Sequence, residues 1–298
     1  MRTLLLGEAL VDLVCERPVA SIAEAESFTP RFGGAMANVA VAARRAGGDV
    51  ALAGGAGADD WGGWLRGRLE DEGVALDWFR LVEGVPTPVA FVTVDAGGEP
   101  TFRLYAEGIG IALDAVAPEL DDAVSACGAL CFASNTLVGE RERELTLAAR
   151  DRALALGRPV VFDPNLRLHR WRSAERAAQA ARECVHGAFL VKANAEEARL
   201  MTGERDPDRA AAGLLAAGAR HVVITLGAGG ALLRGERLDR DVEGVAARVV
   251  DTTGAGDALL GVLVARLGDS GYYGPALAAA LPEAVAAAAR VTERWGAH

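Results

Sequence analysis

The sequence predicts an α/β protein with a mainly parallel central sheet that is covered by helices on both faces. Short β-rich runs alternate with longer helical stretches along the 298 residues, which is typical of repeated βαβ units. The chain is 51% hydrophobic and contains 36 glycines, so it can bury a large core and still make many tight turns. Residues 1–298 are therefore expected to form one domain.

Turn residues and apolar runs place the individual elements. Gly73 and Gly157 each follow an amphipathic stretch, as glycine commonly does just past a helix C-terminus. Short apolar runs that end in a polar residue mark the strands. In chain order the sequence predicts a strand at 4–6, a helix that opens at the diglycine 33–34 and continues to 45, helices at 60–72 and 140–156, strands at 159–163 and 188–191, helices at about 194–202 and 207–217, a strand at 221–226 and a helix that begins near 257.

Two segments, at about 9–32 and 86–107, show alternation and aromatic residues without a helical period. Residues 89–94 and 101–105 flank the turn Asp95-Ala96-Gly97-Gly98, which predicts a β-hairpin. These strands could form a small sheet that covers the site as a lid. The alternative is an antiparallel edge added to the main sheet.

Charge and cysteine content exclude several classes of partner. The net charge of −10 and a pI near 5 argue against nucleic-acid and anionic-membrane surfaces, which need clustered positive charge. The four cysteines are scattered and complete no metal-binding spacing, which indicates reduced thiols in a cytoplasmic protein. The apolar run 4–6 is too short for a signal peptide or a membrane span, so we expect a buried strand there.

A glycine-rich turn at residues 251–257 precedes an apolar helix and is the most informative motif of the chain. The backbone N–H groups of Gly254, Ala255 and Gly256 can point at one anion, and the helix dipole adds positive charge there. Asp257 is then best placed to take a proton from an incoming hydroxyl, as a general base in phosphoryl transfer. The alternative is an ordinary helix start with an aspartate in its first turn.

Further polar residues follow the predicted strands at their carboxyl ends, where ligands bind in such sheets. They are Asp163, Lys192 and the turn 225–227. Lys192 is the only lysine of the chain, a compact charge that can meet a phosphate. Asn194, one of four asparagines, is followed by Glu197; a plain capping box explains this pair equally well, and both roles can coexist.

Five motifs in this order resemble the ribokinase-like (PfkB-type) carbohydrate kinases, most closely the branch of fructokinases and 2-keto-3-deoxygluconate kinases. The resemblance runs almost end to end and implies a three-layer α/β/α sandwich with a small β-sheet lid. The motifs are Gly7–Asp12, Gly33–Ala40, Asp163–Arg167 with Trp171, Lys192–Glu197 and Asp251–Asp257.

The resemblance also implies roles for single residues. Asp257 is the catalytic base, and the amides of Gly254, Ala255 and Gly256 form an anion hole for the transferred phosphate. Sugar-binding positions are Asp12, Gly33, Gly34, Asn38, Tyr105 and Arg167, together with Asp257. Positions that border ATP are Lys192, Asn194, Thr225, Gly227 and Gly229, with Gly254 and Gly256; Asn194 and Glu197 organise Mg²⁺, and Asp251 and Thr253 border a monovalent cation site for K⁺.

Three departures from the family pattern bear on the substrate. Ala106 stands where these kinases usually place an arginine after the tyrosine, and Gly110-Ile111 replaces an Ala-Asp pair. Arg103 shares a strand face with Tyr105, so it either compensates or is a solvated lid residue. The chain stops at 295–298, about where relatives continue. Arg167 is either an anchor for an acidic sugar or part of an ion pair at a strand end.

The sequence therefore predicts an ATP- and Mg²⁺-dependent kinase that phosphorylates a primary hydroxyl of a small sugar, with fructose as the leading substrate. Alternatives are a 2-keto-3-deoxygluconate kinase, another PfkB-type sugar or nucleoside kinase, and a catalytically silent sensor on the same fold. A nicotinamide dehydrogenase is disfavoured because no Gly-x-Gly-x-x-Gly follows the first strand. The lid sheet could also build a homodimer.

Overall fold

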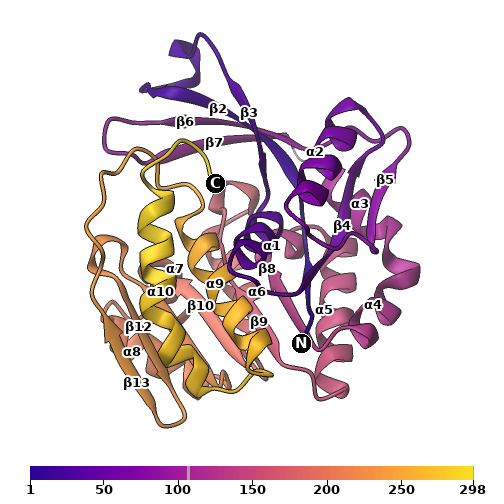
Figure 1. Ribbon diagram of the computed structural model, residues 1–298. Helices are drawn as coiled ribbons and strands as arrows, with labels where there is room; N and C mark the ends of the chain where they lie inside the picture. The colour runs from indigo at the N-terminus through magenta and orange to yellow at the C-terminus, as the bar shows by residue number, and fades with distance from the viewer. Residues whose placement is uncertain (106–107, 298) are drawn as a thin grey trace.

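The computed structural model describes residues 1–105 and 108–297 as a three-layer α/β/α sandwich with a separate small sheet above one edge (Figure 1). The central sheet has nine strands in the order β13-β12-β11-β10-β9-β8-β1-β4-β5. Neighbours from β11 to β5 run parallel, and β12 and β13 are antiparallel. The predicted fold class, with a mainly parallel central sheet, is confirmed.

Most strands of the central sheet are buried on both faces and read as short apolar runs, as parallel sheets require. The strands of this sheet are β1 (Thr3–Leu6), β4 (Val50–Gly57), β5 (Phe79–Val82), β8 (Ala129–Ala133), β9 (Val160–Asp163), β10 (Leu190–Asn194), β11 (His221–Thr225), β12 (Ala231–Gly235) and β13 (Leu238–Val242).

The helices alternate with these strands along the chain. They are α1 (Ala35–Arg45), α2 (Asp60–Asp71), α3 (Gly108–Ala115), α4 (Leu120–Ala126), α5 (Glu140–Ala155), α6 (Ala174–Glu183), α7 (Ala195–Thr202), α8 (Pro207–Ala216), α9 (Ala255–Asp269) and α10 (Pro275–Val291), with short 3₁₀ turns that include η4 (Leu168–Arg170) and η5 (Gly227–Gly229). The strand predicted at 188–191 is observed at Leu190–Asn194, and the other predicted helices and strands lie within two residues of the observed ones. Strands β4, β5, β8, β12 and β13 and helices α3, α4, α6 and α10 were not predicted.

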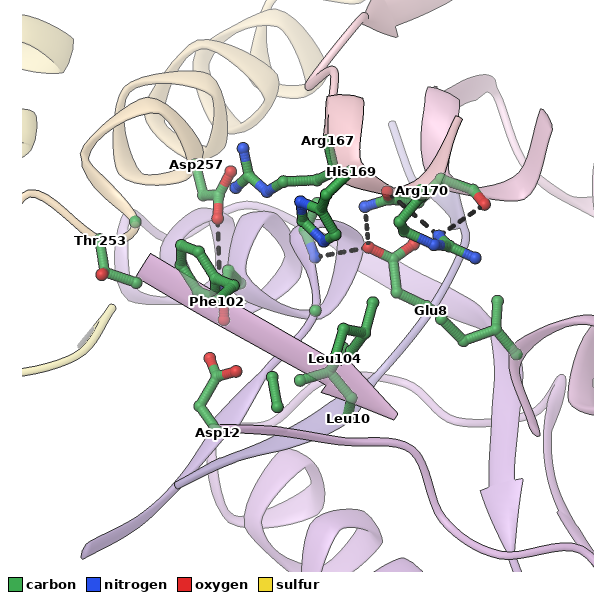
Figure 2. A pocket seen from close by; sticks show the side chains of 17 residues that line it. Glu8, Leu10, Asp12, Phe102, Leu104, Arg167, His169, Arg170, Thr253 and Asp257 are labelled. Atoms are coloured by element: carbon green, nitrogen blue, oxygen red, sulfur yellow. Dashed lines mark hydrogen bonds between the residues drawn. The ribbon is translucent and has the colours of Figure 1, made fainter. Parts of the chain in front are cut away.

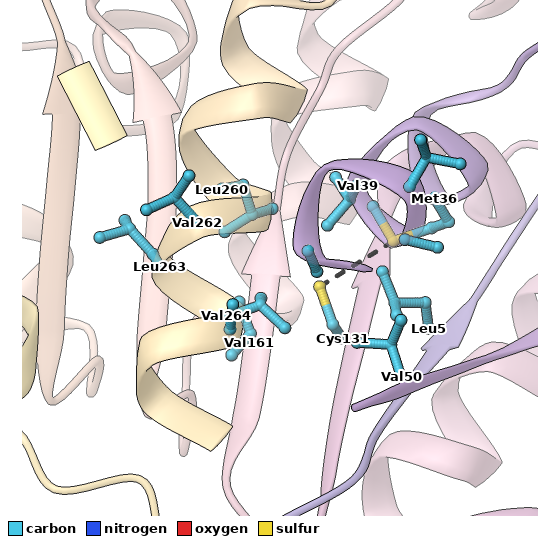
Figure 3. Packing of buried hydrophobic residues seen from close by; sticks show 14 of the residues in the cluster. Leu5, Met36, Val39, Val50, Cys131, Val161, Leu260, Val262, Leu263 and Val264 are labelled. Atoms are coloured by element: carbon cyan, nitrogen blue, oxygen red, sulfur yellow. Dashed lines mark hydrogen bonds between the residues drawn. The ribbon is translucent and has the colours of Figure 1, made fainter. Parts of the chain in front are cut away.

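Helices α1, α9 and α10 cover one face of the central sheet, and α4 to α8 cover the other. Figure 3 shows apolar side chains of α9 and α1 meeting residues from the strands, among them Leu5, Val50 and Val161. Gly261 of α9 permits this close packing, because a Cβ there would lie 2.4 Å from the Ala42 Cβ of α1. The packing fixes the two helices whose N-terminal ends reach the site described below.

The second sheet has four strands in the order β3-β2-β6-β7, formed by β2 (Leu10–Pro18), β3 (Thr29–Gly33), β6 (Val89–Val94) and β7 (Pro100–Tyr105). The two predicted segments therefore come together in space, and the hairpin between β6 and β7 forms as expected. This sheet is separate from the central one, so the alternative of an added edge is wrong. Ala106, where the sequence departs from the family, lies outside the described residues.

All four cysteines are buried and free, as expected for reduced thiols. Within residues 1–105 and 108–297, no helix combines the length and apolar character needed to cross a membrane.

His221, at the start of β11, is an unusual member of the core. Its side chain is 3% exposed and its ring lies edge-on to Phe189, with centroids 4.9 Å apart. Neither ring nitrogen has a hydrogen-bond partner among the described residues. Burial lowers the pKa of His221, Arg220 lowers it further, and Glu236 acts in the opposite direction. The neutral imidazole is therefore the form that the core accepts.

We expect His221→Leu to make the stability of the protein less sensitive to acid. The pKa of His221 is lower in the folded chain than in the unfolded one, near 6.5, so the unfolded state binds the proton more readily. The wild type should lose unfolding free energy as the pH falls below about 6.5, each unit of pKa difference being worth about 1.4 kcal/mol. Urea unfolding of both proteins at several pH values measures this. An equal loss in both would contradict the assignment.

Candidate active site

A pocket lies between the carboxyl ends of the central strands, the start of α9 and the small sheet (Figure 2). Its location matches the rule that ligands bind outside the carboxyl ends of parallel strands. Polar residues and a few apolar residues of the small sheet share its surface. The lining residues are Glu8, Leu10, Asp12, Gly34, Ala35, Asn38, Ala90, Phe102, Leu104, Ile109, Asn135, Arg167, His169, Arg170, Thr253, Gly254 and Asp257.

Asp257 lies in the first turn of α9, and two asparagine side chains hold its carboxylate. Asn38 Nδ2 donates a hydrogen bond to Oδ2 at 2.9 Å, and Asn165 Nδ2 donates to Oδ1 at 3.3 Å. Burial raises the pKa of Asp257 to about 6; Lys192 opposes the rise, and Asp163 adds to it. A buried carboxylate with this pKa is a stronger proton acceptor than a solvated one and is still ionised at neutral pH.

Asp12 faces the same pocket from strand β2 of the small sheet. Burial raises its pKa to about 7, Arg167 opposes this, and the nearby charge of Asp257 adds to it. Gly33, on the neighbouring strand β3, makes room for the carboxylate, because a Cβ at this position would lie 2.1 Å from Asp12 Oδ2. Gly33 therefore shapes the pocket wall through its missing side chain.

Gly34 precedes α1 with a φ of +97°, which favours glycine. A Cβ there would lie 2.5 Å from the backbone oxygen of Glu8. The bend at Gly34 brings Asn38, in the first turns of α1, to Asp257. The structure thus brings together Asp12, Gly34, Asn38 and Asp257, four of the residues that the sequence placed in one site.

The glycine-rich turn ends at Gly254, which has a φ of +77° and begins α9. Ala255 N–H donates to the Thr252 carbonyl oxygen at 3.3 Å. The N–H groups of Gly254, Gly256 and Asp257 have no acceptor among the described residues, as the first turn of a helix leads one to expect. Of the three amides predicted to form an anion hole, those of Gly254 and Gly256 are unengaged within the described residues, as is that of Asp257, whereas that of Ala255 is engaged.

Lys192 lies beneath this turn. Its side chain is 6% exposed, and Nζ forms an ion pair with Asp163 Oδ2 at 3.0 Å. Burial by itself lowers the pKa of Lys192, but the charges of Asp163, Glu197 and Asp257 together raise it. A Cβ on Gly256 would lie 2.7 Å from Nζ, so the ammonium group sits directly against the start of α9.

Asn194 and Glu197 form a reciprocal capping box at the start of α7. Asn194 Oδ1 accepts from Glu197 N at 2.8 Å, and Glu197 Oε2 accepts from Asn194 N at 2.9 Å. Glu197 Oε1 also accepts from Leu166 N at 2.8 Å. Burial and then Asp163 raise the pKa of Glu197, against the effect of Lys192. The capping alternative is thus confirmed, and both oxygens of Glu197 already have donors.

The remaining positions predicted to border a nucleotide lie beside Asn194. Thr225 pairs with Asn194 across β10 and β11, at the carboxyl ends of both strands. Gly227 and Gly229 form the exposed turn η5 immediately after it. Neither turn residue lines the pocket of Figure 2, so the two predicted binding regions are adjacent but distinct.

Asp251 is fully buried and connects the glycine-rich turn to the end of the chain. Its Oδ1 accepts from Thr253 N and its Oδ2 from Gly296 N, both at 2.8 Å. Among the described residues no cationic side chain pairs with it. Thr253 Oγ1 is buried beside the pocket and has no partner among them either.

Arg167 lines the pocket instead of forming an ion pair at the strand end. Its guanidinium carbon lies 5.4 Å from the ring centroid of Phe102. Within residues 1–105 and 108–297, no carboxylate lies within ion-pair distance of it, although its charge lowers the pKa of both Asp12 and Asp257. The guanidinium is therefore available to a ligand.

The expected position of Tyr105 at the substrate needs correction. Side chains alternate along β7, so Phe102 and Leu104 face the pocket whereas Arg103 and Tyr105 face outward. Tyr105 is 67% exposed and contacts Phe91 edge-on. Arg103 is also exposed, which agrees with a solvated residue of the small sheet.

Several pocket residues had no predicted role. Asn135 lines the pocket, and Asn165 lies outside its lining but donates to Asp257; both belong to the four asparagines, and that rarity was the available signal. Glu8 belongs to a motif that carried the resemblance, but no role was attached to it. Arg170 and His169 lie in the turn η4 and gave no signal, yet both line the pocket. Burial, then Arg167 and Arg170, lower the pKa of His169.

Several known proteins are similar to this chain. Fructokinase-2 of Solanum habrochaites is 34% identical over 264 residues, which cover 88% of this chain and 80% of that protein. The structure of fructokinase from Vibrio cholerae O395 with fructose, ADP and calcium ion superposes with a TM-score of 0.86 at 30% identity, covering 99% and 94% of the two chains. Its double mutant with fructose, ADP and potassium ion also gives 0.86, at 29% identity and 99% and 93% coverage.

A family model described as pfkB family carbohydrate kinase matches residues 2–298. The match spans the central sheet, the small sheet and the glycine-rich turn. Together with the fructokinase relatives, it makes the protein a sugar kinase. The chain belongs to the pfkB family of carbohydrate kinases.

Proposed function

We propose that this sugar kinase transfers the γ-phosphoryl group of ATP to a primary hydroxyl of a small sugar, with fructose as the leading substrate. One observation carries the proposal. A buried carboxylate, Asp257, lies in the pocket at the turn where three backbone N–H groups have no acceptor among the described residues. The fructokinase relatives favour a ketose. We also place the enzyme in the cytoplasm, which supplies ATP and keeps thiols reduced.

In this proposal Asp257 accepts the proton of the sugar hydroxyl. Asn38 and Asn165 hold both carboxylate oxygens, so the base is oriented before the sugar arrives. The N–H groups of Gly254, Gly256 and Asp257 stabilise the charge of the phosphoryl group as it moves between oxygens. Lys192, close to Gly256, adds positive charge beneath the same point.

ATP with a divalent cation supplies the phosphoryl group. Among the described residues no group of three or more His, Cys, Asp or Glu side chains is spaced to hold a metal ion. This fits Mg²⁺, which usually binds through phosphates, water and one or two carboxylates. Asn194 and Glu197 then act near Mg²⁺ indirectly, since their mutual hydrogen bonds fix the start of α7. Thr225, Gly227 and Gly229 border the nucleotide in this proposal.

We retain a monovalent cation such as K⁺ in the proposal on the basis of charge. Asp251 is fully buried and accepts from two backbone amides, and no cationic side chain of the described part of the chain pairs with it. A cation beside Asp251 and the Thr253 hydroxyl would balance this charge. It would also stabilise the turn that carries Gly254.

A sugar acid is the second candidate substrate, because Arg167 faces the pocket without a carboxylate partner among the described residues. A guanidinium group in that position suits a carboxylate. The small sheet closes the pocket with Asp12, Phe102 and Leu104, so we propose that it acts as a lid that excludes water.

The first test measures ATP consumption by the purified protein with Mg²⁺, with and without K⁺, across fructose, 2-keto-3-deoxygluconate, ribose, tagatose and nucleosides. Asp257→Asn should lower kcat on the preferred substrate by about 100-fold or more, since the proton acceptor is lost. Asp269→Asn, at the other end of α9, is the matched control and should retain wild-type turnover. Full activity of Asp257→Asn would refute the mechanism, and sugar binding without turnover on any compound would favour a sensor.

Gly256→Ala tests the proposed contact between the anion hole and Lys192. The new Cβ would lie 2.7 Å from Nζ and must push the ammonium group away from the start of α9. We expect kcat to fall by about 10-fold or more, in line with the loss of one electrostatic contact to the transferred group. Gly67→Ala in α2, where a Cβ meets nothing within 4 Å, is the control for adding a methyl group. Unchanged kcat in Gly256→Ala would argue against this role.

The outer face of the small sheet supports a proposed homodimer. Phe28 and Tyr105 both contact Phe91 edge-on, with centroid distances of 5.1 and 6.0 Å, and form an aromatic cluster on the side away from the pocket. Tyr105 is exposed and the two phenylalanines are half-buried, and aromatic surface clusters mark protein interfaces. A second copy of the sheet is the proposed partner.

Tyr105→Glu should therefore separate the two copies. We expect light scattering to give twice the chain mass of 30.9 kDa for the wild type and a single mass for the variant. Tyr273→Glu, which changes a tyrosine of similar exposure outside the small sheet, should leave the mass unchanged. A monomeric wild type at micromolar concentration would rule the dimer out.

A further inference from the structure

Glu8 is a buried carboxylate in the substrate pocket, and Figure 2 shows it on the side opposite Asp257. Glu8 is 4% exposed. Oε1 accepts two hydrogen bonds, from Ala35 N at 2.9 Å and from Asn135 Nδ2 at 2.7 Å. Oε2 is buried and accepts none from the described residues. A buried carboxylate oxygen without a donor is unfavourable, which points to a donor on the ligand.

The neighbours of Glu8 prevent it from satisfying Oε2 by rotation. Arg170 Nη1 donates to the backbone oxygen of Asn135 at 2.9 Å and to its Oδ1 at 3.2 Å. This fixes the amide of Asn135 with Nδ2 toward Glu8. The first N–H of α1, on Ala35, holds the same oxygen from another direction. The carboxylate is therefore locked with Oε2 left for another group.

The chemistry around Oε2 favours a hydroxyl group as its partner. A hydroxyl donates to Oε2 and can still accept from the guanidinium of Arg170, which lines the same part of the pocket. A substrate carboxylate has no proton to donate at neutral pH, and it would meet the negative charge of Glu8. This part of the pocket therefore suits a neutral polyhydroxy sugar.

We propose that Glu8 is a specificity-determining residue whose Oε2 accepts a hydrogen bond from a sugar hydroxyl remote from the one that is phosphorylated. The inference rests on the sugar-kinase function proposed above and selects a neutral sugar over a sugar acid. Glu8 contacts the substrate without taking part in proton transfer. Replacing Glu8 should therefore change the affinity for the substrate and the preference between substrates.

The test uses Glu8→Gln, a change of one atom. The glutamine oxygen can keep the bonds from Ala35 N and Asn135, while an NH₂ group replaces Oε2. For the neutral sugar, we expect KM and the dissociation constant measured without ATP to rise by about 10- to 100-fold, as for a lost hydrogen bond to a charged group. The value of kcat should change less than about 3-fold, because the lost contact is equally strong in the bound and transition states.

Glu142→Gln is the matched control. Glu142 also carries a charge that acts on Arg170, and its Oε1 accepts from Gly139 N, but it does not line the pocket. This variant removes the same charge from the surroundings of Arg170 and should keep wild-type KM within about 2-fold. A rise in KM equal to that of Glu8→Gln would reduce the effect to general electrostatics and overturn the proposal.

Monodeoxy analogues of the preferred sugar identify the hydroxyl. One analogue, lacking a hydroxyl remote from the phosphorylated one, should be penalised by about 10-fold or more in the wild type and not further in Glu8→Gln. Equal penalties in both proteins for every analogue would overturn the proposal. If Glu8→Gln does not fold, the absence of any such penalty in the wild type overturns it.

The two proposals fail in different ways. If the wild type phosphorylates no sugar, the proposed function and this inference are both wrong. A wild type that phosphorylates a sugar acid better than every neutral sugar, or whose sugar kinetics do not change in Glu8→Gln, removes this inference alone.

Discussion

Burial of the Asp257 carboxylate is the constraint on which the rest of the site depends. An ionised group in the interior is unfavourable unless hydrogen bonds and opposite charges surround it. Here two asparagines from different parts of the chain, Asn38 and Asn165, donate to its two oxygens. Lys192 and Arg167 supply positive charge that opposes the effect of burial on its pKa. The elements that carry these groups must therefore meet at one point.

The packing of the helices provides that meeting point. The α1 and α9 helices pack closely where Gly261 faces Ala42, and this brings Asn38 against the first turn of α9. From the other side, β9 ends at Asp163 and β10 carries Lys192, and the ion pair of these two residues lies under Gly256. Gly256 and Gly261 thus have the same role at two contacts. Each lets another part of the chain approach α9 more closely than a side chain would allow.

The sequence was sufficient for the fold and for the central residues of the site because the relevant signals are local. A glycine-rich turn before an apolar helix, and polar residues after buried strands, can be recognised without knowing which elements touch. These local signals placed Asp257, and the family resemblance placed Asp12, Gly34 and Asn38; the structure brings these four residues into one pocket. Strand β8 was missed although it is a short apolar run, because such runs are equally compatible with buried helix.

Other features depend on contacts that no local pattern reveals. The register of β7 against β6 determines which face of β7 meets the pocket, and no local pattern shows this register. Tyr105 was therefore expected at the substrate, whereas the structure places it on the outer face. The same holds for Glu8, whose two donors come from positions 35 and 135. The engagement of Ala255 N–H with Thr252 is a matter of turn geometry that composition does not fix.

Asp12 and Asp257, the two pocket carboxylates with raised pKa values, have different roles. Burial raises the pKa of both, and the charge of Asp257 adds to the rise at Asp12. With values of about 7 for Asp12 and about 6 for Asp257, the first proton bound as the pH falls goes mainly to Asp12. Asp257 then stays ionised and able to accept a proton near neutrality. Asp12, partly protonated there, can donate to or accept from a sugar hydroxyl, which suits a residue that binds the substrate and leaves proton removal to Asp257.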